Sequence, residues 1–498
     1  MSRNNVFVLL SAMSFFAMVL SSCRTIPTYG GGSEDIANGM ATSSSGCALI
    51  GHTHSRNMTF GDVNVDASEL FVLTVDADED VEWVITMGGS GDDVGCSISA
   101  AQDGGWFVSG YTNSQDDEFT RQLDDQSRLR CGAYDGLVAK IRPNGSVAWR
   151  QFVGGTLNDF AYGVESTKDG GCIVSGYSES STGDFDGTAS GNHDAFLAKF
   201  DSTGTRQWIK VYGGSGADRV YSVAECRDKG YVFSGYTESV NGIFRSSQSG
   251  RTDAVVVRVD DQGGVLWTKT LGGTGADYGA VVKPAAKGGI LVLGSTASAD
   301  GDFSGVNHIE QGAAATRDVF VAKLDDNGNV VWRTTIGGSA NEVAGGFYEN
   351  DDGSVMVTGY THSDDGDFED MNHGVTFLTD VLDIEVTSDI FVTKLDSSGN
   401  LVWSRTYGGA NYEQAKCIIP RKGGGYLITG FTESINGDFR RSSRSPSRRY
   451  NSSTRSGSLL GGLVVAAVGA AVDNANTQGL QSEKDIFLLT IDENGERQ

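Results

Sequence analysis

The chain has little proline, little histidine and little positive charge. Its 498 residues include 5 prolines and 6 histidines, and 38 lysines and arginines stand against 64 aspartates and glutamates, so the formal net charge is −26 at pH 7. An acidic surface of this kind repels nucleic acid and anionic lipid headgroups. We therefore expect no nucleic-acid partner. We interpret the acidity mainly as a solubility feature, with a preference for cations or basic partners as the alternative.

The common signatures of catalysis and metal binding are also absent. The sequence contains no Cys-x-x-Cys spacing, no His-Glu-x-x-His, no Gly-x-Ser-x-Gly and no phosphate-binding loop. Its histidines are scattered, and three of them follow an asparagine, which is typical of turns. A carboxylate pair for glycoside cleavage stays open in a chain with 64 acids, but no pair stands out. These absences favour a binding protein over an enzyme.

The amino terminus contains an export signal. Residues 1–22 carry one charged side chain, Arg3, followed by the apolar run Val6–Leu20. Leu20-Ser21-Ser22-Cys23 then resembles the lipobox of bacterial lipoproteins. The resemblance implies that Cys23 is diacylated, for example with palmitate, and anchors the mature protein to a membrane of the bacterial cell envelope. By the same resemblance, the absence of aspartate after Cys23 points to the outer membrane. An ordinary cleaved signal is the alternative.

The rest of the chain is a repeat. The stretch Asp194–Asp218 reads as a strand, a tight turn, a strand with a tryptophan and a Gly-Gly turn closed by an acid. Glycine is abundant at 69 residues, as many turns require. Since one copy is too small to bury its own apolar face, the copies must pack on one another. The other copies are Asp135–Asp159, Asp253–Asp277, Asp318–Glu342 and Asp389–Glu413.

Seven units can be aligned on the Gly-Gly-x-x-x-acid turn. Each unit contains short β-rich runs, and in Asp318–Leu324 apolar side chains occur on both faces of the strand, which indicates burial on both sides. We therefore predict an all-β, seven-bladed β-propeller of four-stranded blades, forming one domain over residues 23–498. The seven turn acids are Asp35, Asp93, Asp159, Asp218, Asp277, Glu342 and Glu413.

The two ends of the chain together complete one unit. The seventh unit stops at Gln498, where its tryptophan strand should start, and Arg24–Tyr29 precedes a Gly-Gly pair as the fourth strands do. We predict that this amino-terminal strand closes the last blade, which removes an open sheet edge. Cys23 would then lie near the membrane on the face of the Asp-Gly-Gly turns. The long loops between second and third strands would face outward.

The repeat resembles that of exported bacterial β-propeller proteins. The likeness is carried by Asp169–Tyr177, Gly301-Asp302-Phe303, Asp318–Asp325 and Asn329–Trp332. It implies a propeller and an envelope location, and no particular activity.

Two other propeller repeats are similar in part. Asp201–Gly204 followed by Trp208 looks like the repeat of quinone-cofactor propellers, among them an outer-membrane assembly lipoprotein, with one residue fewer between Asp and Gly. Asp326–Gly328 followed by Trp332 is similar to the Asp box of sialidases, with the aromatic residue one place late. A sialidase would also need an arginine cluster, and the basic residues do not recur across the units to form one.

Acidic residues supply two candidate sites. The turn acids could form a ring for cations, but an acid present in every unit better suits a structural duty. We expect each to cap its own turn through backbone N–H groups. The acids in the loops between second and third strands recur less regularly and lie beside glycines, which suits calcium as a candidate cofactor. The candidate calcium ligands are Asp300, Asp302, Asp364, Asp365 and Asp367.

One segment breaks the repeat. Residues 440–484 contain six arginines between Arg440 and Arg455 and the apolar run Leu459–Val472, which is too short to span a membrane as a helix. We interpret the segment as a low-complexity insertion, with a hook for an anionic partner as the alternative. The combined prediction is a monomeric, lipid-anchored envelope propeller that binds or scaffolds a protein or glycan partner through its long-loop face. An assembly-factor role and a glycan-active hydrolase or lyase are the alternatives.

Overall fold

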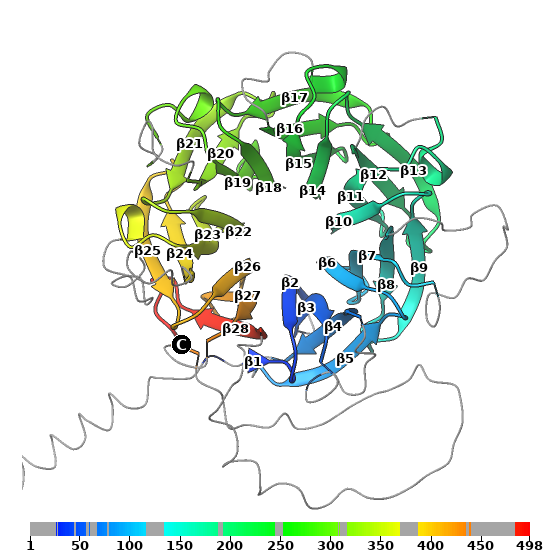
Figure 1. Ribbon diagram of the computed structural model, residues 1–498, viewed down its shortest axis with the longest axis horizontal. Coiled ribbons are helices and arrows are strands. Elements are labelled where there is room, and N and C mark those ends of the chain that lie inside the picture. The colour runs from blue at the N-terminus through cyan, green and yellow to red at the C-terminus, as the bar shows by residue number, and fades with distance from the viewer. Residues whose placement is uncertain are drawn as a thin grey trace, which may run out of the picture.

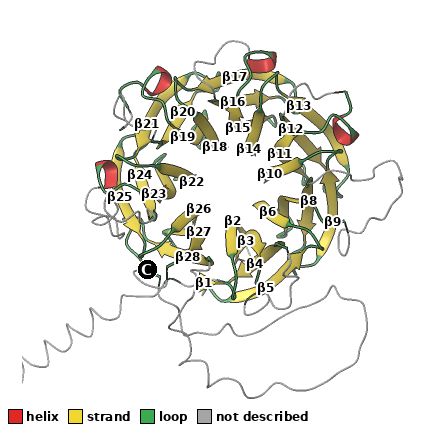
Figure 2. Ribbon diagram, in the orientation of Figure 1, coloured by secondary structure: helices red, strands yellow, loops and turns green. Residues whose placement is uncertain are grey.

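Seven small sheets are arranged around a central axis in the computed structural model (Figure 1). Each sheet is a blade of four antiparallel strands, which confirms the predicted seven-bladed propeller for the described part of the chain. Helical structure in these residues is limited to short 3-10 turns at the outside of the ring (Figure 2), and none of it is long and apolar enough to cross a membrane. The structure describes residues 26, 28–43, 46–55, 59, 67–76, 79–115, 134–187, 193–244, 252–306, 308, 316–368, 387–434, 438–439 and 484–498.

Two predicted features lie outside the described residues. One is the amino-terminal region 1–25, with the export signal and Cys23. The other is the insertion, of which residues 440–483 are not described.

The strands of each blade follow one another from the axis outward (Figure 1). Blade 1 consists of β2 (Asp35–Ser43), β3 (Gly46–Thr53), β4 (Glu69–Val75) and β5 (Val81–Met87). Blade 2 consists of β6 (Asp93–Ala100), β7 (Trp106–Thr112), β8 (Asp135–Ile141) and β9 (Val147–Val153). Blade 3 consists of β10 (Asp159–Ser166), β11 (Cys172–Ser178), β12 (Asp194–Phe200) and β13 (Arg206–Tyr212). Blade 4 consists of β14 (Asp218–Glu225), β15 (Tyr231–Thr237), β16 (Asp253–Val259) and β17 (Val265–Leu271). Blade 5 consists of β18 (Asp277–Pro284), β19 (Ile290–Thr296), β20 (Asp318–Leu324) and β21 (Val330–Ile336).

Blades 6 and 7 complete the ring. Blade 6 consists of β22 (Glu342–Glu349), β23 (Val355–Thr361), β24 (Asp389–Leu395) and β25 (Leu401–Tyr407). Blade 7 consists of β26 (Glu413–Pro420), β27 (Tyr426–Thr432), β28 (Asp485–Ile491) and β1 (Thr28–Tyr29). The 3-10 turns η2 (Gly183–Phe185), η3 (Gly242–Phe244), η4 (Gly301–Phe303) and η5 (Gly366–Phe368) follow the second strands of blades 3 to 6.

The core lies between the blades. Third strands are buried on both faces, as in β12, where every residue of Asp194–Phe200 is buried. One hydrophobic cluster joins Phe107 and Val138 of blade 2 to Val174 and Phe196 of blade 3. Equivalent clusters join the other six pairs of neighbouring blades. A single blade would leave this apolar surface in water, so the ring folds as a unit.

The recurring tryptophan joins each of blades 1 to 6 to the blade that follows it. A Cβ on Gly204 would lie 2.6 Å from the ring of Trp149 in the preceding blade, so the ring lies directly on the Asp-x-x-Gly turn. Gly204 also has φ +87°, a backbone conformation that favours glycine. The Trp149 Nε1–H donates to the Ser202 carbonyl of the same turn at 3.0 Å. Tryptophan and turn therefore recur together because they form one contact between neighbouring blades.

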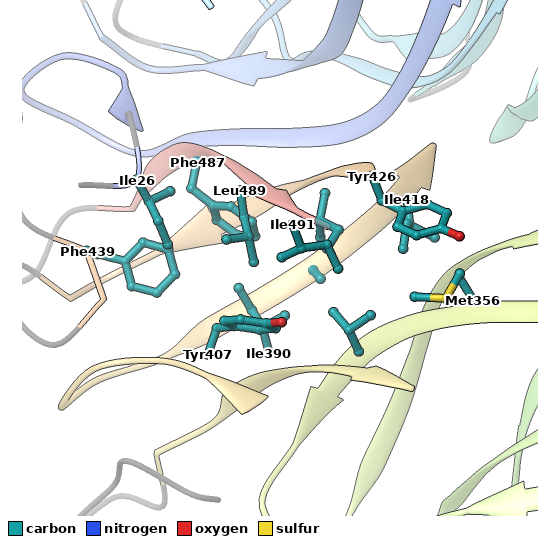
Figure 3. Packing of buried hydrophobic residues seen from close by; sticks show 13 residues of the cluster. Ile26, Met356, Ile390, Tyr407, Ile418, Tyr426, Phe439, Phe487, Leu489 and Ile491 are labelled. Carbon is teal, nitrogen blue, oxygen red and sulfur yellow. The ribbon is translucent and has the colours of Figure 1, made fainter. Parts of the chain in front are cut away.

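The amino-terminal strand closes the last blade, as predicted. Thr28 and Tyr29 of β1 pair with Phe487 and Ile486 of β28. Ile26 is only 3% exposed and lies in the cluster shared with blade 6 (Figure 3). The last blade is therefore built from residues at both ends of the described chain.

The beginning of this outer strand differs from the expectation that Arg24–Tyr29 would form all of it. Arg497 forms a bridge with Ile491, and the Gln498 N–H donates to the Thr490 carbonyl at 3.1 Å. The carboxyl-terminal residues turn back after β28 and take the place where an amino-terminal strand of full length would begin. The outer strand of blade 7 is thus a composite of two segments.

Candidate functional site

Each turn acid ties the end of the second strand to the turn that precedes the first strand. The Asp218 carboxylate accepts hydrogen bonds from the Gly214 N–H at 2.8 Å and the Ser239 hydroxyl at 2.7 Å. The Thr237 hydroxyl is its third donor. All seven acids are buried, and their carboxylates are used within the fold. Equivalent bonds are made by Asp35, Asp93, Asp159, Asp277, Glu342 and Glu413.

Burial raises the pKa of these acids, although their hydrogen bonds act in the opposite direction. The pKa is about 6 for Asp35 and Asp159 and about 7 for Asp93, Glu342 and Glu413. Near neutral pH these carboxyls therefore exchange protons while remaining inside the protein. The stability of the fold should therefore depend on pH in this range.

A second acid, the first residue of a third strand, lies beside the turn acids, and it is buried in blades 1 to 6. A Cβ on Gly213 would lie 2.1 Å from the Asp194 carboxylate and 3.1 Å from that of Asp218, so only glycine fits between the two. Calcium takes about six to eight oxygen ligands. Within the described ranges, no group of three or more His, Cys, Asp or Glu side chains is placed to hold a metal ion.

The loop acids also bind the Gly-Gly turn. Asp302 of η4 donates its N–H to the Gly272 carbonyl at 2.9 Å and accepts the Gly272 N–H through Oδ2 at 3.2 Å. Asp300 accepts the Thr274 N–H at 2.7 Å. The buried side chain of Phe303 fixes this loop against the blade. The carboxylates of blade 5 are therefore used to hold backbone N–H groups.

Blade 6 repeats this arrangement. Asp367 accepts the Gly337 N–H at 3.0 Å and Asp365 accepts the Ser339 N–H at 2.7 Å, whereas Asp364 is exposed. The other two candidate calcium ligands belong to blade 5. The structure thus places the five candidates in two separate turns and does not bring them together as one ligand set.

Aromatic side chains gather on the face where the long loops leave the blades. In blades 2 to 5 the second residue of the first strand lies opposite the sixth residue of the second strand, as Phe160 pairs with Tyr177 and Arg219 with Tyr236. These positions, the bulged residue of the first strand and the residue before the third strand carry most of the rings. We call the following set the aromatic belt: Tyr111, Tyr134, Phe160, Tyr162, Tyr177, Tyr221, Tyr236 and Tyr278.

The rings of the belt form a continuous series from blade 2 to blade 5. Six of the eight side chains are partly exposed, and only Tyr177 and Tyr236 are buried. The ring pairs are edge-to-face, tilted or stacked, and the edge-to-face and offset-stacked arrangements are those that aromatic pairs prefer. Ring centroids are 4.9 Å apart for Tyr111 and Phe160, 5.0 Å for Phe160 and Tyr177, 5.7 Å for Tyr177 and Tyr162, 5.3 Å for Tyr162 and Tyr221, 6.1 Å for Tyr221 and Tyr236, and 5.1 Å for Tyr236 and Tyr278.

Two arginines lie among these rings. The Arg219 guanidinium carbon is 4.5 Å from the ring centroid of Tyr177 and 5.9 Å from that of Tyr236. Arg317 lies 5.0 Å from the ring centroid of Tyr278, at the end of the series. Among the described residues, neither guanidinium has a carboxylate within ion-pair distance. Positive charge is thus held by ring faces on an otherwise acidic molecule.

His193 connects Arg219 to an acid at the edge of the belt. Its Nε2 lies 3.3 Å from Arg219 Nη2 and 3.0 Å from Glu179 Oε1. One ring nitrogen either donates or accepts, so a bond to Glu179 leaves the Arg219 N–H without an acceptor there. Arg219 Nε and His193 Nδ1 are buried and have no hydrogen-bond partner among the described residues. The cluster therefore has hydrogen-bonding capacity that the fold does not use.

The sequence interpretation missed the belt. Its clearest signal was the recurring Gly-Tyr-(Thr/Ser) at the end of second strands, as in Gly176-Tyr177-Ser178. The arginines gave no signal, because Arg219 is the second residue of a first strand whereas Arg317 directly precedes a third strand. Folding brings these unlike repeat positions to one face, so the absence of a recurring basic position did not exclude a basic cluster.

The comparisons with known proteins agree with a propeller. No protein-family model matches the chain. An alignment 260 positions long, which covers 45% of the chain, is 24% identical to an uncharacterized WD repeat-containing protein of Acanthamoeba polyphaga mimivirus. The match spans 19% of that protein's length. WD repeats build propeller blades, in line with the fold described above.

Two solved structures illustrate how far the likeness extends. The Pan2 WD40 domain of Neurospora crassa is 9% identical with a TM-score of 0.39, and the match covers 80% of this chain and 86% of that one. A gluconolactonase of Xanthomonas campestris is 11% identical with a TM-score of 0.34, and the match covers 82% of this chain and 97% of that one.

Proposed function

We propose that this protein is a binding module rather than an enzyme. It would be a propeller, lipid-anchored in the bacterial cell envelope, that holds a protein or glycan partner on its long-loop face. The observation that carries the proposal is the aromatic belt with Arg219 and Arg317, which have no carboxylate partner among the described residues. Tyrosine and arginine are among the residues that dominate binding interfaces.

At its first-strand positions the belt departs from the sevenfold repeat, which supports a role in recognition. The ring near the end of the second strand recurs more widely, as Tyr360 in blade 6 and Phe431 in blade 7. At the position of Phe160, Arg219 and Tyr278, the first strands of blades 1, 2, 6 and 7 carry Ile36, Val94, Val343 and Gln414. Residues shared by all blades support the fold, as the turn acids do. Residues specific to a few neighbouring blades are not needed for that purpose, and they form one patch on one side of the ring.

Anchoring at Cys23 would fix the position of the propeller relative to the membrane. Two residues separate Cys23 from the buried Ile26, so the acyl chains would enter the membrane within about 10 Å of this residue. More than one acyl chain gives stable anchoring. This short tether brings the rim of blade 7 close to the membrane. The lack of aspartate after Cys23 supports the outer membrane.

The anchor is tested by labelling with a palmitate analogue in a bacterial host. The wild-type chain is expected to incorporate label and to fractionate with membranes, and Cys23→Ala to do neither. Cys417→Ala is a matched control, since that thiol is only partly buried yet lies inside the fold. Label that persists in Cys23→Ala would contradict the proposal.

The binding role is tested by capture from detergent-solubilised envelopes with the full chain. The double variant Tyr278→Ala, Arg317→Gln removes one end of the belt, where both side chains are accessible. The control Val331→Ala, Arg142→Gln changes an exposed apolar residue and an exposed arginine elsewhere. We expect the belt variant to lose the captured component and the control to keep it. Equal capture by both variants would refute the binding role of this face.

A further inference from the structure

Arg219 defines what kind of ligand the belt can take. Its guanidinium lies between the rings of Tyr177 and Tyr236, and its polar neighbours are His193 and Tyr221. The Nε–H is buried and has no partner in the described part of the chain. Acids outnumber bases by 64 to 38 in this sequence. An arginine held here without a carboxylate therefore leaves that place for a ligand.

The chemistry of the guanidinium selects a carboxylate-bearing ligand. Its N–H groups form a planar fork that matches the two oxygens of a carboxylate. Stacking between two rings holds the fork in one orientation, so less freedom is lost on binding.

The rings around Arg219 select the rest of the ligand. Tyr162, Tyr221 and Tyr278 are partly exposed and offer apolar ring faces together with hydroxyl groups. A pyranose has the complementary surface, with a C–H face on one side and hydroxyls at its rim. A ring series that continues over four blades suits several sugar units in a row.

The charge of the whole molecule limits the number of acidic groups on the ligand. A formal charge of −26 repels polyanions such as nucleic acid. An acidic peptide would also pair with Arg219, but it has no sugar rings to stack on the aromatic rings of the belt. A short oligosaccharide with one or two carboxylates fits both the charge and the rings.

We propose that the belt binds carboxylated sugars, with Arg219 pairing with the carboxylate and the tyrosines stacking on the sugar rings. Arg317, at the far end of the belt beyond Tyr278, would pair with a second acidic unit. This inference rests on the proposed binding role and names its ligand class. The carboxylate could belong to a uronic acid or to a sialic acid, and the test includes both.

Isothermal titration of the full chain in detergent tests the proposal. The probes are trigalacturonate, sialyllactose and neutral galactotriose. We expect one of the acidic probes to bind and galactotriose to bind at least about tenfold more weakly. Arg219→Gln is expected to weaken the acidic probe by about ten- to hundredfold. Arg142→Gln, an exposed arginine in the turn after β8, changes the charge equally and should leave binding unchanged.

Each outcome decides for or against the ligand class. Melting temperatures show whether Arg219→Gln is folded, and Arg317→Gln, whose side chain is exposed, is the second variant if it is not. Equal binding of neutral and acidic sugars, wild-type affinity in both variants, absence of sugar binding, or tighter binding of an acidic peptide would overturn the proposal. If sugars fail while envelope capture still depends on Tyr278 and Arg317, the binding role stands and only the ligand class is wrong.

Discussion

The Asp218 carboxylate is buried, and three hydrogen-bond donors of its own blade offset the cost of removing it from water. We expect Asp218→Ala to lower the free energy of unfolding by about 3 kcal/mol, since a backbone N–H and two hydroxyls lose their acceptor. Urea denaturation of the full chain measures this change. Asp261→Ala removes an exposed acid and should change the value by less than about 0.5 kcal/mol. Similar losses in both variants would contradict the assigned role.

The protonation of the turn acids predicts how stability depends on pH. Burial raises the pKa of Glu413 to about 7, whereas a glutamate in an unfolded chain has a pKa of about 4.3, so the folded state holds the proton more tightly. The stability that this difference contributes is complete below about pH 4 and is lost as the pH rises through 7. The other turn acids shift in the same direction.

We therefore expect the free energy of unfolding to decrease between pH 5 and 7 in the wild-type chain. In Glu413→Gln the decrease should be shallower by up to about 1.4 kcal/mol per pH unit, which corresponds to one proton. Urea titrations at several pH values give both slopes. Glu82→Gln, at an exposed position of β5, serves as control and should keep the wild-type slope. A wild-type slope in Glu413→Gln would refute the protonation argument.

At the level of the strands, the belt depends on how closely β14 and β15 approach each other. A Cβ on Gly235 would lie 1.8 Å from the Arg219 carbonyl oxygen, so only glycine permits this pairing. We expect Gly235→Ala to cost more than about 4 kcal/mol or to prevent folding. In Gly288→Ala the added Cβ meets no atom within 4 Å, so only the backbone at φ +96° is strained, and we expect a loss of about 1 kcal/mol in the free energy of unfolding. Circular dichroism with urea denaturation distinguishes them, and equal costs would mean that the close approach is not limiting.

The loop turns predict how the protein responds to calcium. Because the Asp302 and Asp367 carboxylates accept backbone N–H groups, we expect a chelator to leave the melting temperature unchanged. Asp302→Ala should lower the free energy of unfolding by about 1 kcal/mol through the lost hydrogen bond. Differential scanning calorimetry with and without calcium tests both statements. A rise of several degrees on adding calcium, abolished in Asp302→Ala, would contradict this expectation and support the calcium hypothesis.

The fold could be predicted from the sequence because each repeat unit carries the residues that form its own blade. The Gly-Gly turn, its acid and the tryptophan occur at fixed spacing, and each makes a contact within its blade or with the next one. By contrast, the sequence did not reveal what the Asp302 carboxylate contacts. Its partner, Gly272, lies thirty residues earlier, and nothing near Asp302 in the sequence indicates that a backbone N–H will meet its carboxylate.

The belt could not be predicted because its residues come from unlike positions of different units. Tyr134 precedes a third strand, Tyr162 occupies a bulge, and Arg219 is the second residue of a first strand. A repeat alignment searches for positions that agree, and a binding site on one side of a symmetric ring is made of positions that differ. Only the placement of four neighbouring blades reveals the patch.

For the whole molecule, closure of the ring depends on few residues. β1 contributes two residue pairs, and Ile26 anchors it in the cluster shared with blade 6. We expect Ile26→Asp to lower the free energy of unfolding by more than about 3 kcal/mol, because a charge would be buried without a partner. Val331→Asp, which is 60% exposed, should have little effect. Hydrogen exchange in β28 should accelerate in Ile26→Asp alone, and unchanged protection would contradict the importance of this seam.

The composite outer strand also determines how the protein responds to a mechanical load. Tension applied at the amino-terminal end would act first on the two pairs between β1 and β28 and on the buried Ile26. The force would reach the seven hydrophobic clusters between blades only after β1 had separated from β28. A propeller tethered by this end would therefore rupture at one defined place, and the force needed would be set by a segment of a few residues.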